Sequence, residues 1–348
     1  MAKFLSSDRS DRSPVGPEQA PRVPCFGALD LGTNNCRLLI VRPEGTGHRV
    51  VDSFSRIVRL GEGCSASNRV SEKAVRRTIG ALKVCAKKLH GHHVTKFRCV
   101  ATEACRRATN GAKFVTRVRK ATGLPLEIIS PEEEVALTFA GCAELIVPGD
   151  GWALVFDIGG GSTEVTWARL DGEGNHRIEG FLSLPVGVVT LAEERGATGF
   201  GHEAYASIVE ELALRFCSFD AAHGIARRIA EGGVQMLGTS GTTTTLAGIL
   251  LDLKRYDRSR VDGSYLERER VHGLHGLAAQ LLDTTLEERI ANPCIGRGRA
   301  DLVIPGCAIL EAIWRTWPAP RLRVADRGIR EGILKSLIGT WPLPALAS

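Results

Sequence analysis

A segment at residues 155–170, VFDIGGGSTEVTWARL, is the strongest guide to the architecture of this chain. An earlier segment at residues 26–41, FGALDLGTNNCRLLIV, has the same layout. Each reads as an apolar strand, Asp-x-Gly, small or hydroxyl residues and a second apolar strand, which predicts a tight β-turn with a carboxylate at its entrance. Asp157 follows Asp30 by 127 residues (157 − 30). The repeat therefore predicts two similar half-domains that face each other.

Both predicted turns have residues that suit phosphate chemistry. Glycine lets backbone N–H groups approach an anion without a Cβ in the way. The residues expected at the phosphate are Thr33, Asn34 and Arg37 in the first copy, and Gly159, Gly160, Gly161 and Ser162 in the second. Asp30, Asp157 and Glu164 are candidate ligands of Mg²⁺, because that ion prefers oxygen ligands and keeps several waters. For either turn alone, an ordinary hairpin is the alternative interpretation.

The string LGTSGTTTTLAG at residues 237–248 predicts a third anion site. It reads as the end of a strand, a Gly-rich turn and the start of a helix, where free N–H groups and the helix dipole favour negative charge. The candidate residues are Gly238, Ser240, Gly241 and Thr242. A threonine-rich helix cap without a ligand is the alternative interpretation.

Two further helix starts add charged candidates. ATEACRRATN at residues 101–110 places Arg106 at a strand-to-helix junction, where a guanidinium can bind a phosphate; a solvated helix face is the alternative. In PEEEVAL at residues 131–137, Pro131 and three glutamates predict the first turn of a helix. Compensation of the helix dipole explains Glu132 without any function. A hydrolase, however, needs a base, and one inward-facing carboxylate of this turn would serve.

Composition and charge restrict the class of protein. The 348 residues predict about two domains, and 43% hydrophobic and 24% charged residues are ordinary for a globular protein. The net charge of +6 suits a small anionic substrate, and 5% aromatic residues are few for base stacking, so no nucleic-acid partner is expected. No apolar run is long enough for a membrane span. Residues 1–23 lack the apolar region of a secretory signal, which predicts a disordered tail on a cytoplasmic protein.

Neither the cysteines nor the histidines show the spacing of a metal site. The ten cysteines contain no C-x-x-C pair, so we expect mostly buried thiols in a reducing compartment. His90, His92 and His93 lie together, and His272 and His275 form H-x-x-H, but no acid or cysteine accompanies them at ligand spacing. Surface or capping roles are therefore expected for these histidines.

Predicted strands and helices alternate along the whole chain, which indicates an α/β fold. Apolar spacing predicts helices over residues 71–92 and 202–222 and a third strand over residues 50–60. Because the turn motif repeats, two related domains are favoured over one continuous sheet.

Eight strings of the chain together resemble a known family. In order they are ALDLGTNNCRLLI, VRLGEG, ATEACRRATN, EIISPEEEVAL, VFDIGGGSTEV, LGTSGTTTTLAG, DLVIPGCAIL and VADRGIREGIL, and they cover about residues 25–340. The chain resembles the exopolyphosphatase/guanosine pentaphosphate phosphohydrolase family of the actin/hexokinase/Hsp70-like superfamily. The resemblance implies two actin-like (ribonuclease H-like) domains with a central cleft. It assigns residues 24–134 and 327–348 to the first domain and residues 135–326 to the second, with the last helix returning to the first.

The resemblance also implies an activity and residue roles. The activity is Mg²⁺-assisted hydrolysis of the terminal phosphoryl group of a phosphate chain, with a monovalent cation such as K⁺ as an open question. The catalytic glutamate falls on Glu134, with Glu133 beside it. Asp157, Gly159, Gly160, Ser162 and Glu164 match the second phosphate loop, Thr33 and Asn34 the first, Arg106 the phosphate-binding arginine, and Gly238 to Thr242 the loop of the second domain. The chain departs from the family pattern at Pro131, Ala136 and Glu103.

Several alternatives stay open on the sequence. The substrate is inorganic polyphosphate or guanosine pentaphosphate, because both present a terminal phosphoryl group to the same loops. A kinase of the same superfamily would need a nucleotide and an acceptor hydroxyl. A non-catalytic sensor of guanosine tetra- or pentaphosphate would keep the loops and lose turnover. Preferred chain length and a homodimer are also undecided.

Overall fold

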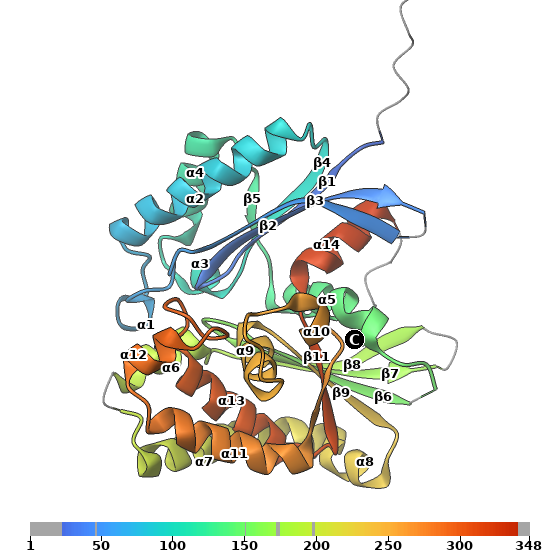
Figure 1. The fold of residues 1–348 in the computed structure, drawn as a ribbon. Coiled ribbons are helices and arrows are strands. Elements are labelled where there is room, and N and C mark those ends of the chain that lie inside the picture. The colour runs from blue at the N-terminus through green and yellow to red at the C-terminus, as the bar shows by residue number, and fades with distance from the viewer. Residues whose placement is uncertain (1–22, 46, 150, 172–174, 197–198, 340–348) are drawn as a thin grey trace, which may run out of the picture.

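The computed structural model describes residues 23–45, 47–149, 151–171, 175–196 and 199–339; the side chains of residues 269–275 are also outside the description. The chain forms two β-sheets, each covered by helices on its outer side, with two helices between them (Figure 1). Most of the predicted tail, residues 1–22, lies outside the described residues, and so do the side chains of His272 and His275.

The first domain is built on a five-stranded sheet of order β3-β2-β1-β4-β5. Its strands are β1 (Phe26–Leu31), β2 (Asn35–Glu44), β3 (Gly47–Ile57), β4 (Lys96–Ala101) and β5 (Leu126–Ile128). Its outer helices are α1 (Cys64–Ser67), α2 (Glu72–Gly91), α3 (Glu103–Arg107) and α4 (Gly111–Thr122). Helix α2 begins where predicted, because the Ser71 side chain accepts a hydrogen bond from Ala74 N.

The second domain is built on a six-stranded sheet of order β10-β11-β9-β6-β7-β8. Its strands are β6 (Trp152–Ile158), β7 (Thr163–Leu170), β8 (His176–Leu184), β9 (Val234–Thr239), β10 (Tyr265–Glu267) and β11 (Arg321–Ala325). Its helices are α6 (Val188–Arg195), α7 (His202–His223), α8 (Ile225–Glu231), α9 (Gly241–Leu250), α10 (Arg258–Val261), α11 (Arg268–Leu282), α12 (Leu286–Ala291) and α13 (Val303–Thr316).

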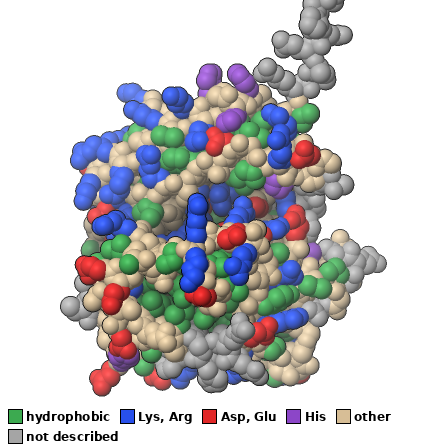
Figure 2. All heavy atoms as spheres, in the orientation of Figure 1, with side chains coloured by type: hydrophobic (Ala, Val, Ile, Leu, Met, Phe, Trp, Pro, Cys, Tyr) green, Lys and Arg blue, Asp and Glu red, His purple; other side chains and the backbone are tan. Residues whose placement is uncertain are grey.

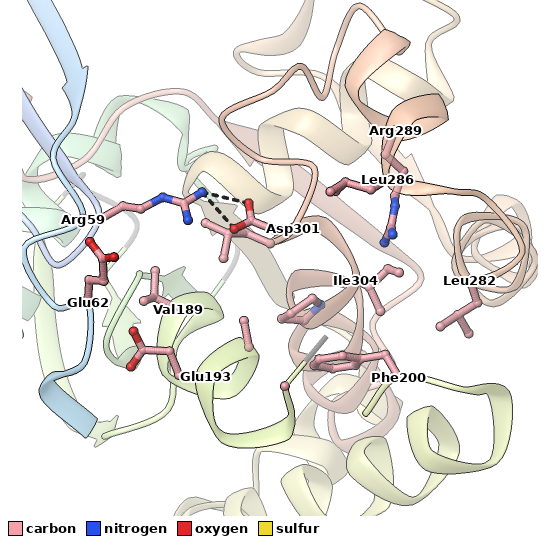
Figure 3. A pocket seen from close by; sticks show the side chains of 14 residues that line it. Arg59, Glu62, Val189, Glu193, Phe200, Leu282, Leu286, Arg289, Asp301 and Ile304 are labelled. Carbon is pink, nitrogen blue, oxygen red and sulfur yellow. Dashed lines mark hydrogen bonds and ion pairs between the residues drawn. The ribbon is translucent and has the colours of Figure 1, made fainter. Parts of the chain in front are cut away.

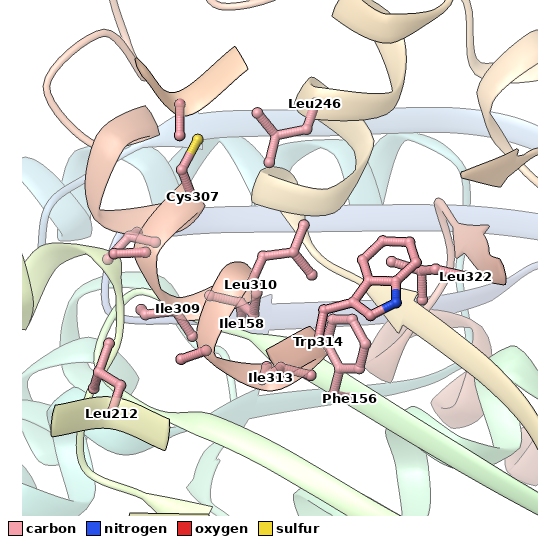
Figure 4. Close-up of a cluster of buried hydrophobic side chains, with 14 of the residues drawn as sticks. Phe156, Ile158, Leu212, Leu246, Cys307, Ile309, Leu310, Ile313, Trp314 and Leu322 are labelled. Carbon is pink, nitrogen blue, oxygen red and sulfur yellow. The ribbon is translucent and has the colours of Figure 1, made fainter. Parts of the chain in front are cut away.

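A large apolar core holds the second domain together. Phe156 and Ile158 of β6 pack against Leu310 and Trp314 of α13 and Leu246 of α9 (Figure 4). Burying side chains of this size contributes about 1.5–3 kcal/mol each. Because β6 ends directly at the second turn motif, this core gives that turn a rigid base.

Helices α5 (Pro131–Cys142), followed by the short η1 (Ala143–Leu145), and α14 (Ile329–Ile338) lie between the two sheets (Figure 1). Their backbones touch, since a Cβ at Gly332 would overlap Leu137 O and one at Gly141 would overlap Gly328 O. On its other side α14 joins the apolar cluster of β1. The last helix therefore packs against the sheet of the domain to which the resemblance assigns it. The domain boundaries at residues 134 and 327 stay predictions.

Two simpler expectations also have clear outcomes. Nine of the ten free cysteines are buried and Cys217 is exposed, which confirms the expectation of mostly core thiols. Among the helices of the described residues, none combines the length and apolar character that crossing a membrane requires.

Candidate active site

The two sequence repeats form structurally equivalent hairpins. In the first, Gly32 N donates a hydrogen bond of 2.9 Å to Asn35 O; in the second, Gly159 N donates one of 2.9 Å to Ser162 O. Both turns sit at the ends of central antiparallel strand pairs, β1–β2 and β6–β7. The repeat seen in the sequence is thus a repeat of backbone hydrogen bonding.

The strand register also equates the charged positions of the hairpins. Asp30 lies across the strand pair from Arg37, and Asp157 lies across from Glu164. The same position opposite the aspartate is therefore basic in the first hairpin and acidic in the second.

A cavity of about 120 Å³ lies between the two turns. It is lined by most of the predicted site: Asp30, Thr33, Asn34, Arg37, Glu134, Asp157, Gly159, Gly160, Gly161, Ser162, Ser240 and Gly241. These residues come from both domains and from α5 between them. The cavity is therefore the place where distant motifs of the sequence meet.

The glycines of the second turn have a structural reason beyond anion binding. A Cβ at Gly160 would lie 3.1 Å from Asn34 N, and one at Gly161 would overlap Thr33 Oγ1. The two turns contact each other directly across the cleft. Larger residues at these positions would force the domains apart.

The first turn is held from behind by the segment after β3. Val58 N and Arg59 N both donate to Asn34 O, at 2.8 and 2.9 Å, and Gly61 N donates to Thr33 O at 3.0 Å. This is why β3 ends at Ile57, three residues before the predicted end of that strand. The N–H groups of Val58, Arg59 and Gly61 bond to the turn and not to a neighbouring strand.

Three glutamates at the start of α5 have three different environments. Glu133 points away from the cavity and pairs with Arg98 at 2.6 Å. Backbone and Ser130 hydrogen bonds at the helix start hold the pKa of Glu132 below its usual range. Glu134 alone lines the cavity, and its burial, reinforced by the nearby Glu164 charge, raises its pKa well above the usual range. The geometry therefore selects Glu134 over Glu133 as the group that can act on a bound molecule.

Arg106 is engaged by protein groups in this structure. Its guanidinium donates to Glu134 at 2.6 Å, to Ile129 O at 3.0 Å and to Glu103 at 3.2 and 3.3 Å. Glu103, one of the departures from the family pattern, thus occupies the arginine that was expected to bind phosphate. In this state Arg106 orients the Glu134 carboxylate.

The predicted metal-binding carboxylates share an environment that disfavours ionisation. Burial raises the pKa of Asp157 to about 6, and the charge of Asp30 adds to the shift. Burial also raises the pKa of Glu164 to about 7, aided by Asp157. Glu164 does not line the cavity; it accepts a hydrogen bond of 2.9 Å from Ser183 Oγ.

The third predicted anion loop only partly reaches the cavity. Ser240 and Gly241 line it, whereas Gly238 is buried in β9 against the Phe156 ring and Thr242 packs against Gly306. The Ser240 side chain itself accepts from the N–H groups of Thr242 and Thr243, at the start of α9. These donors are therefore occupied by the cap. Ser240 has φ 119°, a conformation that side-chain-bearing residues rarely adopt.

Sequence reasoning missed a group of charged residues behind the site. A second cavity of about 50 Å³ shares Asp30, Arg37 and Asp157 with the first and is also lined by Asp326, Arg330 and Glu331. These side chains come from VADRGIREGIL, which served only to recognise the family. Dense charge directly after the buried strand β11 was the available signal.

A larger cavity, about 450 Å³, lies elsewhere, where Arg59 and Glu62 of the first domain face the second domain (Figure 3). Its walls are largely apolar, including Val189, Phe200 and Ile304. At its rim Arg59 pairs with Asp301 at 2.8 Å, which ties the loop behind the first turn to the second domain. The volume of a cavity therefore does not identify the candidate active site; the smaller cavity, of about 120 Å³, is the one lined by the buried carboxylates and the glycine-rich turns.

The fold and the site define a class: an α/β protein with two β-sheets, in which opposed glycine-rich turns line a cavity of about 120 Å³ with a buried carboxylate. Comparison with protein families matches residues 39–340 to the Ppx/GppA phosphatase family. The chain belongs to this family, and the protein is a phosphoanhydride hydrolase.

Individual relatives agree with this assignment. The chain is 30% identical over 327 residues to exopolyphosphatase 2 of Mycobacterium tuberculosis, covering 90% of this chain and 98% of the relative. It is 27% identical over 339 residues to a guanosine-5'-triphosphate,3'-diphosphate pyrophosphatase of Vibrio cholerae, covering 92% of this chain and 60% of the relative.

Solved structures agree on the fold. The Ppx/GppA family member of Aquifex aeolicus superposes with a TM-score of 0.74 at 27% identity, covering 91% of this chain and 98% of that one. An exopolyphosphatase of Cytophaga hutchinsonii superposes with a TM-score of 0.81 at 22% identity, over 92% and 100% of the two chains, which shows likeness of fold alone. The predicted fold class is confirmed.

Proposed function

We propose that this protein is an exopolyphosphatase that hydrolyses the terminal phosphoryl group of inorganic polyphosphate with the help of Mg²⁺. Guanosine pentaphosphate is a second candidate substrate, because it presents the same kind of terminal group. The observation that supports this best is the cavity where two N–H-rich turns, Arg37 and the buried Glu134 converge. Relatives named exopolyphosphatase and guanosine pyrophosphatase agree with it.

The acidic residues at the cavity fit a divalent cation. Asp30 Oδ1 is buried without a hydrogen-bond partner in the described part of the chain. The raised pKa values of Asp157 and Glu164 indicate carboxylates whose joint ionisation is costly, and a cation would relieve that cost. The described residues contain no cluster of three or more His, Cys, Asp or Glu at ligand distance, so Mg²⁺ would keep several waters. When bound, it neutralises charge on the phosphoryl oxygens. A K⁺ requirement stays a prediction.

Different residues in and beside the cavity bind the substrate, accept the proton and position the base. N–H groups of the two turns, with Thr33, Ser162 and Arg37, hold the terminal phosphoryl group. Glu134 accepts a proton from water as the water oxygen bonds to phosphorus and the bridging P–O bond breaks. Arg106 holds the Glu134 carboxylate in place through its 2.6 Å hydrogen bond. The shortened phosphate chain leaves with the bridging oxygen.

Phosphate release from polyphosphate and from guanosine pentaphosphate, measured in parallel with Mg²⁺, tests the proposal. Glu134→Gln is expected to lower turnover by about 10²–10⁴-fold, since it removes a positioned base. Glu133→Gln is the matched control, because Glu133 faces Arg98 outside the cavity, and we expect near-normal turnover. Binding of both substrates without release by the folded wild-type protein would instead support a sensor. ATP-dependent phosphorylation of an acceptor would support a kinase.

Three features remain predictions alongside this function. We expect a cytoplasmic location, which agrees with the free cysteines in the structure. The division of the chain at residues 134 and 327 and the homodimer rest on the family resemblance. Limited proteolysis and sedimentation of the full-length protein would test them.

A further inference from the structure

The positive charge of this protein is concentrated on two neighbouring helices of the first domain. Helices α2 and α4 contain ten lysines and arginines and a single acid, Glu72. The whole chain has a net charge of only +6, so the remainder is net negative. Figure 2 shows Lys and Arg side chains gathered on the surface over these helices. The long helix α7 of the second domain, by contrast, contains more acids than bases.

The exposed cations of the two helices form ordered stripes. On α2, Arg76, Lys83 and Lys87 are exposed at a spacing of seven and four residues, so they share one face. On α4, Lys113 and Lys120 are exposed seven residues apart. Both faces point away from the sheet, since the buried residues of these helices, such as Leu82 and Phe114, lie opposite. An ion pair of 2.5 Å between Arg117 and Glu72 joins the helices side by side.

The stripes begin next to the active site. Helix α3 places Arg106 inward on Glu134 and the next residue, Arg107, on the exposed side. Helix α4 follows closely, since Gly111 packs on the Cys105 carbonyl. The start of α2 is tied to the same end through Asn110, whose side chain bonds Val70 N and O at 2.9 Å. Cations therefore continue from α3, whose Arg106 contacts the cavity residue Glu134, along both helices, about 30 Å for the 20 residues of α2.

We propose that this surface, the basic track of Arg107, Arg76, Lys83, Lys87, Lys113 and Lys120, binds the distal part of a long polyphosphate chain whose end is in the active site. The proposal rests on the proposed function and adds a preference for long chains. In the described part of the chain, these six cations form no ion pair, unlike Arg77 and Lys88 of α2, which pair with acids. None of the exposed large apolar side chains lies on α2 or α4, so the track offers no stacking platform for nucleic-acid bases. A polyanion without bases fits it best.

The test compares the full-length protein with two triple variants of equal charge change. The track variant is Arg76→Gln, Lys83→Gln and Lys87→Gln; the control variant is Arg177→Gln, Arg227→Gln and Lys254→Gln, all exposed on the second domain. The ratio of kcat/KM for long polyphosphate over tripolyphosphate is expected to fall about tenfold in the track variant and to stay at the wild-type value in the control. The slope of log Kd for long polyphosphate against log salt should decrease by about 2, since each lost contact removes about 0.7–0.9. An equal ratio in both variants would overturn the proposal.

A binding measurement separates this proposal from the proposed function. End-labelled long polyphosphate is titrated without Mg²⁺, so that the result does not depend on turnover. If neither tripolyphosphate nor long polyphosphate is hydrolysed, the proposed function fails, and a binding loss confined to the track variant would still support the track. If hydrolysis is normal but both triple variants bind long polyphosphate alike, the track fails alone. An RNA oligomer of equal charge that competes as well as polyphosphate would overturn the choice of ligand in favour of nucleic acid.

Discussion

The two hairpins have the same backbone hydrogen bonding but differ in the charge of the residue opposite the aspartate. In both, the aspartate enters a turn closed by the same N–H to carbonyl bond, but the cross-strand partner of Asp30 is Arg37 and that of Asp157 is Glu164. Arg37 partly offsets the burial that raises the pKa of Asp30, whereas the charge of Asp157 adds to the burial that raises the pKa of Glu164. The position opposite the aspartate therefore favours an anion in the first hairpin and a cation in the second.

The turns differ in size as well as in charge. Thr33 and Asn34 of the first turn occupy the positions that Gly160 and Gly161 occupy in the second, and these pairs meet across the cleft. Side chains on one turn fill the space that glycines leave on the other. Two copies of one hairpin therefore form a single asymmetric site, because the side chains and the charges differ at equivalent positions.

Among substitutions in the two hairpins, the largest effect is expected where the two turns touch. Gly161→Ala would place a Cβ on Thr33 Oγ1, so the turns must separate, and a displacement of this kind lowers turnover by about 10²-fold. Thr33→Ala in the same chain removes the opposing oxygen and should recover part of the activity. Phosphate-release rates of the single and double variants measure this. A double variant no better than Gly161→Ala would show that the contact is not the cause.

Substitutions at the two cross-strand partners should separate anion from cation binding. Arg37→Gln is expected to raise KM for polyphosphate by about 10-fold. Glu164→Gln is expected to raise the Mg²⁺ concentration for half-maximal rate by about 10–100-fold, the usual range for residues that support a metal site. Initial rates over a grid of substrate and Mg²⁺ concentrations give both numbers. If each variant changed both constants equally, the different roles given to Arg37 and Glu164 would be wrong.

The carboxylates of the second hairpin should make the protein depend on pH. The pKa values of Asp157 and Glu164 are raised to about 6 and 7, so the folded protein holds protons that the unfolded chain releases, and without Mg²⁺ stability falls as pH rises from about 4 to 7. Mg²⁺ binding needs the ionised forms and should release protons, so its affinity should rise with pH over that interval, by up to tenfold per pH unit for each of the two carboxylates. Calorimetry in buffers of different ionisation enthalpy detects this release. An affinity that does not change with pH would contradict the assignment.

The smallest expected effect concerns Glu103, which contacts Arg106 beside the first hairpin. Glu103→Gln should weaken the hold on Arg106 and let its guanidinium reach a phosphate, which lowers KM by about threefold. Steady-state kinetics at low salt measure the change, with Glu127→Gln as a control that also removes an arginine-paired carboxylate. A raised KM would mean that Glu103 is needed to position Arg106.

Much of the fold was predictable from local pattern. The apolar strands around each Asp-x-Gly turn, the Ser71 cap of α2 and the Pro131 start of α5 all appear at the expected residues. The end of β3 was not predictable, because Val58 and Arg59 bond to a turn more than twenty residues earlier in the chain. Strand propensity depends on local residue types and does not predict a hydrogen-bond acceptor in a distant turn.

The sequence predicted which residues line the site better than it predicted the contacts that they make. Spacing and family resemblance singled out the residues that line the cavity, including Glu134. They did not distinguish the environments of Glu132, Glu133 and Glu134. Adjacent residues of one helical turn point in different directions, and the tertiary structure decides which neighbours each one contacts. Nor did they show that Glu103 would occupy Arg106.

Primary structure alone was enough for the repeated hairpin, the α/β order of elements and the kinds of residue present at a phosphate, because these depend on neighbours within a few positions. The folded arrangement was needed for everything that depends on distance across the cleft. It puts Thr33 against Gly161, removes Gly238 and Thr242 from the cavity wall and raises the pKa of Glu134. The physical reason is that burial, steric contact and charge coupling act between atoms close in space, and the chain brings those atoms together from segments more than one hundred residues apart.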